Sequence, residues 1–129
     1  MRKVVHFEIP ADDVERAKDF YGSVFGWQLQ TMSMGESDYT IVTTTPVDEQ
    51  TQLPTEPGAI NGGLFERSDR LPAPVITVDV DEIDDVLQQI EAAGGKTVTS
   101  RTEIPGMGAF AYFEDPEGNV MGLWETTTT

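Results

Sequence analysis

The sequence predicts an α+β fold made of two similar halves, each with the element order β-α-β-β-β. Three observations support this fold class. Residues 4–10 alternate apolar and polar side chains with the period of a half-buried strand. A helical pattern follows over about residues 13–25, and the same succession of strand and helix begins again at residue 75. An internal repeat constrains the whole fold, so we expect two homologous modules.

In the first half, the strand over residues 4–10 leads into a helix that begins near Asp12, which with Glu15 forms a capping box. The helix pattern stops at Gly26. Three strands rich in Thr, Val, Ile and aromatic residues follow, over about residues 27–34, 39–45 and 58–66. Residues 46–57 contain three prolines and no periodicity, which predicts an exposed loop.

The second half repeats this order. A strand over about residues 75–80 is followed by Asp81, a second capping residue, and by a helix over about 82–93 that ends at Gly94. Further strands are predicted over about residues 96–103, 109–113 and 120–126. The residues from Val5 to Gly26 overlay those from Pro74 to Gly95 without a gap. We therefore expect a single domain with one module at about 1–67 and the other at about 73–129.

Composition limits the possible partners and compartments. The formal net charge of -15 would repel nucleic acid and anionic membrane surfaces, which leaves small molecules or proteins as partners. The chain has no cysteine, so disulfides and thiolate metal sites are excluded. Neither a signal peptide nor an apolar run of membrane-spanning length is visible, so we expect a cytoplasmic protein. The dispersed acidity favours a halophilic protein over an acidic one without a salt requirement.

Two segments carry a resemblance to a known family. The first is His-Phe-Glu-Ile-Pro-Ala-Asp-Asp, residues 6–13, which continues into Lys-Asp-Phe-Tyr and Val-Phe-Gly-Trp. The second runs from Phe113 to Glu125 through Glu-Asp-Pro-Glu-Gly-Asn. They resemble the vicinal oxygen chelate superfamily, which includes glyoxalases, bleomycin resistance proteins and extradiol dioxygenases. The resemblance implies paired βαβββ modules that form an open, barrel-like cup with the helices outside, and a homodimer.

The resemblance also implies a candidate metal site. Metal-dependent members place one ligand on the first strand and one on the last strand of each module. His6, Glu66 and Glu125 match three of these positions, and the fourth falls on Val75, which cannot bind a metal. One imidazole and two carboxylates suit Zn, Ni, Mn or Fe in an open site. The resemblance to glyoxalase I assigns proton transfer to a glutamate, Glu66 or Glu125.

Three functions remain open at this point. The first is a glyoxalase-like, metal-dependent lyase or isomerase that acts on a small substrate with vicinal oxygens. The second is a protein that binds a small molecule or drug without a metal, with His6 as a hydrogen-bonding residue of the cup. The third is an extradiol dioxygenase, which is less favoured because its iron site needs two histidines and His6 is the only one. Glu8 shares the face of His6 and is a weaker candidate for a general base.

Overall fold

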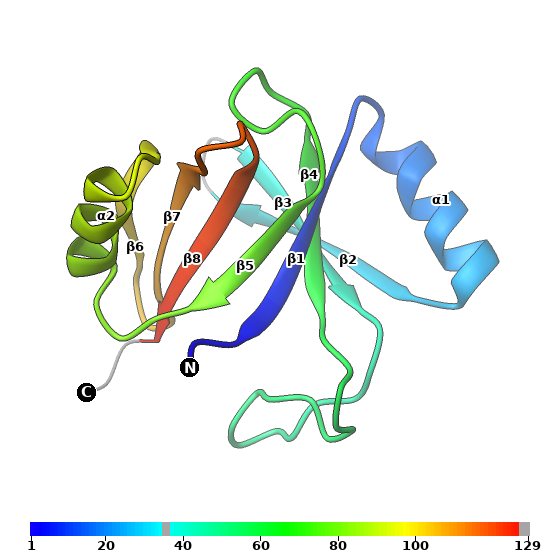
Figure 1. Ribbon diagram of the computed structural model, residues 1–129. Coiled ribbons are helices and arrows are strands. Elements are labelled where there is room, and N and C mark those ends of the chain that lie inside the picture. The colour runs from blue at the N-terminus through cyan, green and yellow to red at the C-terminus, as the bar shows by residue number, and fades with distance from the viewer. Residues whose placement is uncertain (35–36, 127–129) are drawn as a thin grey trace. The chain divides into compact units, whose positions relative to one another are not determined.

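The computed structural model describes residues 1–34 and 37–126 and divides the chain into two compact units (Figure 1). Residues His6–Pro74 form one unit, called module 1 here. Residues Met1–Val5 join Val75–Thr129 in the other unit, module 2. The first five residues belong to module 2 because the backbone N–H of Asp79 donates to the carbonyl of Lys3 at 2.8 Å.

Module 1 contains a four-stranded sheet with a helix on one face. Its elements are β1 (Val4–Ala11), of which the first two residues belong to module 2, α1 (Val14–Phe25), β2 (Gln28–Met34), β3 (Ser37–Thr43) and β4 (Gly62–Glu66). The strands are hydrogen-bonded in the order β2-β3-β4-β1, with β1 parallel to β4 and the other pairs antiparallel. Ala11, Val42 and Leu64 form the buried centre of the core, against which residues of α1 pack.

Module 2 repeats this topology. Its elements are β5 (Val75–Asp79), α2 (Ile83–Ala92), β6 (Lys96–Ile104), β7 (Gly108–Glu114) and β8 (Val120–Thr126). The strand order is β5-β8-β7-β6, and the first strand again lies parallel to the last. Ile83, Val86 and Leu87 of α2 are buried against Ala111 and Leu123 of the sheet. The predicted α+β class and the repeated β-α-β-β-β order are therefore confirmed.

Two strand boundaries differ from those expected from the sequence. β3 ends at Thr43, and β4 begins only at Gly62. The side chain of Asn61 is the physical reason, because its amide oxygen accepts hydrogen bonds from the backbone N–H groups of Thr44 at 2.7 Å and Thr45 at 3.0 Å. The side chain of Asn61 thus replaces the backbone hydrogen bonds between β3 and β4 at this end of the sheet.

The helix starts also differ from expectation. Asp13, one residue later than predicted, caps α1 by accepting a hydrogen bond from the backbone N–H of Arg16 at 3.0 Å. Asp12 instead pairs with Arg67 at 2.9 Å. Helix α1 ends as predicted at Gly26, whose φ of 71° is in the left-handed region that glycine tolerates. None of the described helices is long and apolar enough to cross a membrane.

Candidate functional site

One face of the module 1 sheet is not covered by α1, and we call it the helix-free face. Successive side chains of a strand point to opposite faces of a sheet. Because Phe7 and Leu64 pack in the core beneath α1, their neighbours along β1 and β4 face away from the helix. His6 and Glu8 of β1 and Gly63 of β4 therefore lie on the helix-free face.

A hydrogen-bonded network joins three side chains on this face. The hydroxyl of Tyr39, on β3, donates to Oε2 of Glu8 at 2.8 Å. The same hydroxyl lies 3.2 Å from Nε2 of His6. Since its proton is directed at Glu8, the tyrosine oxygen accepts from His6, which fixes the tautomer with the proton on Nε2 and leaves Nδ1 as an acceptor. Glu8 is only 7% exposed, so its carboxylate depends on such partners.

The network spans β4, and Gly63 makes this possible. Gly63 lies between Glu8 on β1 and Ile41 on β3. A Cβ at position 63 would stand 1.7 Å from the hydroxyl oxygen of Tyr39, far inside any real contact. The tyrosine can therefore reach across the strand only because residue 63 has no side chain. Sequence reasoning did not identify Tyr39, because its distance from Glu8 in the chain gives no signal before the sheet order is known.

Burial determines the charge state of His6. The pKa of the His6 imidazole is lowered from its ordinary value, mainly by desolvation, and the nearby carboxylate of Glu8 opposes this shift only in part. Burial therefore favours the neutral form of the imidazole. The helix-free face thus presents a neutral imidazole and a buried carboxylate, which are both hydrogen-bond acceptors.

Glu66 does not join this network. In the β1–β4 register Ala11 is opposite Glu66, whereas His6 is five residues earlier on β1, about 16 Å away along the strand. Glu66 is also two residues from the core residue Leu64, which places it on the face that α1 covers, and its side chain is exposed. The structure does not bring Glu66 to His6.

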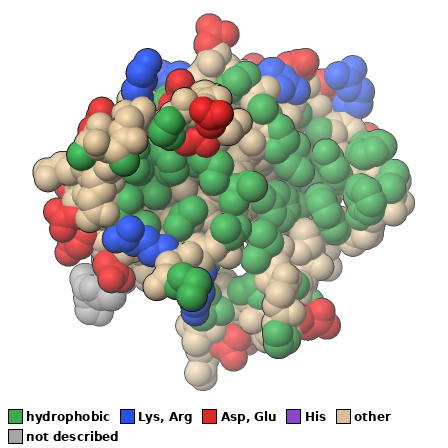
Figure 2. All heavy atoms as spheres, viewed as in Figure 1, with side chains coloured by type: hydrophobic (Ala, Val, Ile, Leu, Met, Phe, Trp, Pro, Cys, Tyr) green, Lys and Arg blue, Asp and Glu red, His purple; other side chains and the backbone are tan. Residues whose placement is uncertain are grey.

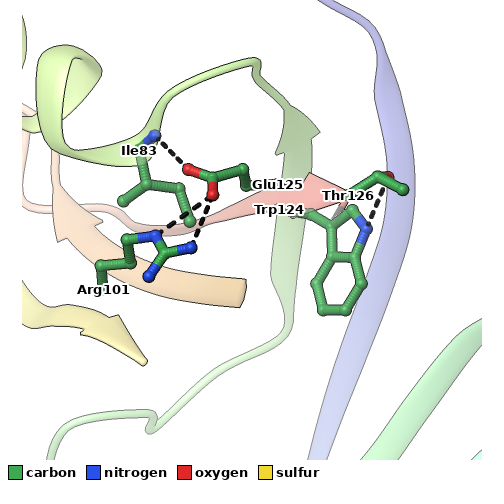
Figure 3. Close-up of polar contacts among 5 residues, drawn as sticks. All are labelled: Ile83, Arg101, Trp124, Glu125 and Thr126. Carbon is green, nitrogen blue, oxygen red and sulfur yellow. Dashed lines mark hydrogen bonds and ion pairs between the residues drawn. The ribbon is translucent and has the colours of Figure 1, made fainter. Parts of the chain in front are cut away.

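Glu125 has a different role within module 2 (Figure 3). Its Oε1 accepts a hydrogen bond at 2.8 Å from the backbone N–H of Ile83, the first residue of α2. Its Oε2 accepts two hydrogen bonds from Arg101, on β6, at 2.7 and 3.2 Å. Arg101, and to a lesser extent the N–H of Ile83, lower the pKa of the Glu125 carboxyl. Glu82, the N-cap residue, makes no side-chain capping bond, so Glu125 supplies the cap of α2 from a distant strand.

Alternate residues of β8 face α2 and the opposite side of the sheet. Leu123 is in the core beneath α2, so Glu125, two residues later, is on the same face. Trp124 faces the other way and donates its indole N–H to Thr126 Oγ1 at 3.2 Å (Figure 3). Trp124 therefore lies on the face of the sheet that α2 does not cover.

The residues present do not fit a metal site of the kind that the resemblance implies. Among residues 1–34 and 37–126, no group of three or more His, Asp or Glu side chains is placed to hold a metal ion. On the face turned away from the helix, Gly63 of β4 lies opposite Glu8 in module 1, and Gly122 of β8 lies opposite Thr77 in module 2. Neither glycine has a side chain that could bind a metal. Val75 is buried and apolar. His6 thus has no second ligand from β4.

Comparisons with known proteins agree on the fold. The model of the Glyoxalase/Bleomycin resistance protein/Dioxygenase superfamily matches residues 3–123. A glyoxylase-like domain-containing protein of Didymella fabae is 32% identical over 121 residues, which cover 90% of this chain and 88% of that protein. The anthracycline biosynthesis protein DnrV of Streptomyces peucetius is 28% identical over 92% of this chain, which spans only 45% of DnrV.

A solved structure extends the comparison. Methylmalonyl-CoA epimerase of Streptomyces coelicolor, in complex with 2-nitronate-propionyl-CoA, superposes with a TM-score of 0.68 and 14% identity. The match covers 98% of each chain. At this identity the likeness shows the fold alone.

Proposed function

Because the chain belongs to the Glyoxalase/Bleomycin resistance protein/Dioxygenase superfamily, we propose that it binds a small organic molecule on the helix-free face of module 1 without a metal. The observation that carries this proposal is the network of His6, Tyr39 and Glu8 across Gly63. The network turns polar side chains toward a face that α1 leaves open. Desolvated polar groups of this kind fix the orientation of a ligand in a mainly apolar site.

The chemistry of the face defines the class of ligand. The Nδ1 atom of neutral His6 and the carboxylate of Glu8 accept hydrogen bonds, so the ligand should donate them through hydroxyl or N–H groups. Met32 and Ile41 lie on the same face and are 44% and 36% exposed, which provides apolar surface beside the acceptors. The net charge of -15 opposes anionic ligands. A neutral, partly apolar molecule with hydroxyl groups fits best.

The second candidate function is the glyoxalase-like, metal-dependent lyase or isomerase with His6, Glu66 and Glu125 as ligands. Family membership and the neutral imidazole of His6 favour it, because only a neutral imidazole can bind a metal. A bound divalent ion would supply Lewis-acid activation of adjacent substrate oxygens. However, Glu66 is about 16 Å from His6 along β1, and Glu125 already binds Arg101 and α2. We therefore place the metal-free binding function first.

The single histidine allows a direct test of the ligand site. We would screen neutral phenols and aromatic alcohols against metal-free protein and follow the imidazole resonances of His6 by NMR. A ligand on the helix-free face should shift these resonances. Tyr39→Phe removes the hydroxyl that orients both His6 and Glu8, so the dissociation constant should rise about tenfold, the typical value of one or two hydrogen bonds.

Tyr21→Phe is the matched control, because Tyr21 of α1 packs against the core of module 1 and lies outside the network. It should leave the dissociation constant unchanged. The proposal is wrong if ligands bind without affecting His6, or if both tyrosine variants weaken binding equally. Binding that requires added Zn, Ni, Mn or Fe would favour the metal-dependent enzyme instead.

A further inference from the structure

Helix α1 exposes apolar side chains that a helix normally buries. None of its residues is buried, whereas Ile83, Val86 and Leu87 of α2 are. Phe20, Val24 and Phe25 are 54%, 57% and 58% exposed. Figure 2 shows hydrophobic side chains gathered over α1, at the right of the view. A group of large apolar side chains of this kind marks an interaction surface.

The exposed side chains border a groove. Arg16, Phe20 and Val24 are spaced four residues apart and form one stripe along α1. Beside the stripe, a groove of about 340 Å³ lies between the helix and the end of β1. Its lining includes residues 9–11 of β1 and the aromatic residues Phe20 and Tyr21 of α1, together with charged side chains such as Arg16. The ridge of exposed side chains on α1 and this partly apolar groove therefore lie next to each other on one surface.

The acidic charge of this surface is partly compensated. Asp12 at the groove is paired with Arg67 at 2.9 Å, and the carboxylate of Asp13 caps α1. Among the described residues, the guanidinium of Arg16 has no ion-pair partner, so it adds positive charge to the stripe. Because each chain carries a net charge of -15, two copies repel least where carboxylates are already neutralised.

We propose that α1 is the interface with a second copy of this chain. A two-fold interface requires a self-complementary surface, in which residue i contacts residue j of the partner and j contacts i. The adjacent ridge and groove meet this requirement: with the two α1 helices antiparallel, Phe20 of each copy enters the groove of the other. This inference gives the expected homodimer a defined surface and does not depend on the proposed ligand site.

The test is the solution mass of the full chain from micromolar to millimolar concentration. It is measured by sedimentation equilibrium in about 2 M KCl, where the Debye length is about 2–3 Å and repulsion between copies is screened. Wild type should form a dimer. Phe20→Asp places a charge in the interface and should raise the dimer dissociation constant at least about a hundredfold. Met107→Asp is the matched control, because Met107 is 61% exposed in a loop of module 2, and it should dimerise like wild type.

Hydrogen exchange of the wild-type protein keeps the test independent of variant folding. Protection of the amides of α1, residues 14–25, should rise with protein concentration, whereas that of α2, residues 83–92, should not. A monomer throughout the concentration range would overturn the proposal. So would equal effects of Phe20→Asp and Met107→Asp, or protection of α1 that is independent of concentration in a protein that dimerises.

Discussion

The two modules share one topology but place their hydrogen-bonded carboxylates on opposite faces of their sheets. In module 1, Glu8 faces away from α1 and binds Tyr39. In module 2, Glu125 faces α2 and binds the first N–H of that helix together with Arg101. Glu125 therefore has a structural task that accounts for its position. Glu8, which is only 7% exposed, instead belongs to the network on which the proposed ligand site rests.

The repeat shows where the modules have diverged. Glu8 is opposite Gly63 across the β1–β4 pair, and Thr77 is opposite Gly122 across the equivalent β5–β8 pair. The overlay of the halves also pairs His6 with Val75. A polar residue facing a glycine has thus been kept in both modules, whereas the imidazole and the carboxylate occur only in module 1. The side chains on which the proposed ligand site rests therefore lie in module 1.

Gly63→Ala should have the largest effect on this comparison. The new Cβ would collide with the hydroxyl of Tyr39, displace the ring and break both hydrogen bonds. We expect a loss of about 3 kcal/mol in the free energy of unfolding, from overpacking and broken hydrogen bonds. Urea denaturation measures this loss. In a Tyr39→Ala background the same change should cost much less, and an equal cost in both backgrounds would contradict the role of Gly63.

Glu125→Ala should have a smaller effect that is confined to module 2. It removes the cap of α2, which is worth about 1–2 kcal/mol, and leaves the network of module 1 intact. Hydrogen exchange should show faster exchange in the first turn of α2 and unchanged exchange in α1. Loss of ligand binding at the helix-free face, with α2 unaffected, would show that Glu125 acts in the site after all.

The hydrogen bonds of Glu125 also predict that the stability of the protein falls at acid pH. The pKa of Glu125 in the folded protein is below its ordinary value of 4.5, so the ionised carboxylate is stabilised by folding. This contribution is fully present above pH 4.5 and is lost as pH falls through the folded pKa. In Glu125→Gln, the loss of stability below pH 4.5 should be shallower than in wild type. Identical acid profiles would contradict this assignment.

His6 should contribute a smaller pH dependence of stability. Folding favours the neutral form of this base, whereas it favours the ionised form of Glu125. Burial lowers its pKa below 6.5, so the unfolded chain takes up a proton before the folded protein does. Stability is then greatest above pH 6.5 and declines as pH falls from 6.5 toward the folded pKa. NMR titration of this single histidine should give a midpoint below 6.5. A midpoint at or above this value would mean that the imidazole is not desolvated as the structure has it.

Added salt should stabilise the two modules to a similar extent. Module 1 holds 12 acidic and 4 basic residues, and module 2 holds 11 and 4, so both carry a similar net negative charge. Screening of this charge should raise the thermal midpoint between about 0.1 and 2 M KCl, as expected of a halophilic protein. Hydrogen exchange should show similar gains in both modules. A midpoint that does not change with salt would remove the screening argument.

Much of the fold could be predicted from the sequence because its signals are local. The alternation in β1, the apolar pattern of both helices and Gly26 depend on neighbouring residues. It was harder to predict which residues of β4 and β8 face the helix and which face the opposite side of the sheet. The matching segments Gly-Leu-Phe-Glu and Gly-Leu-Trp-Glu are real repeats, but in each the leucine packs under the helix and the glutamate follows on the same face.

The candidate site was predictable only in part. His6 and Glu8 could be placed on one face, since they are two residues apart on one strand. Their partner Tyr39 is brought to them by the order of β3, β4 and β1 and by the missing side chain of Gly63. Such non-local determinants leave no periodic signal in the sequence.

The central claim is that the site on module 1 works without a metal, and metal uptake tests it most directly. The protein should be incubated with Zn, Ni, Mn or Fe(II), dialysed and submitted to elemental analysis, together with His6→Ala. We expect no stoichiometric metal in wild type and no difference between the two proteins, because Glu66 is about 16 Å from His6 along β1 and Glu125 already binds Arg101 and the N–H of Ile83. One metal ion per chain in wild type, lost in His6→Ala, would contradict the account and favour the metal-dependent function in its place.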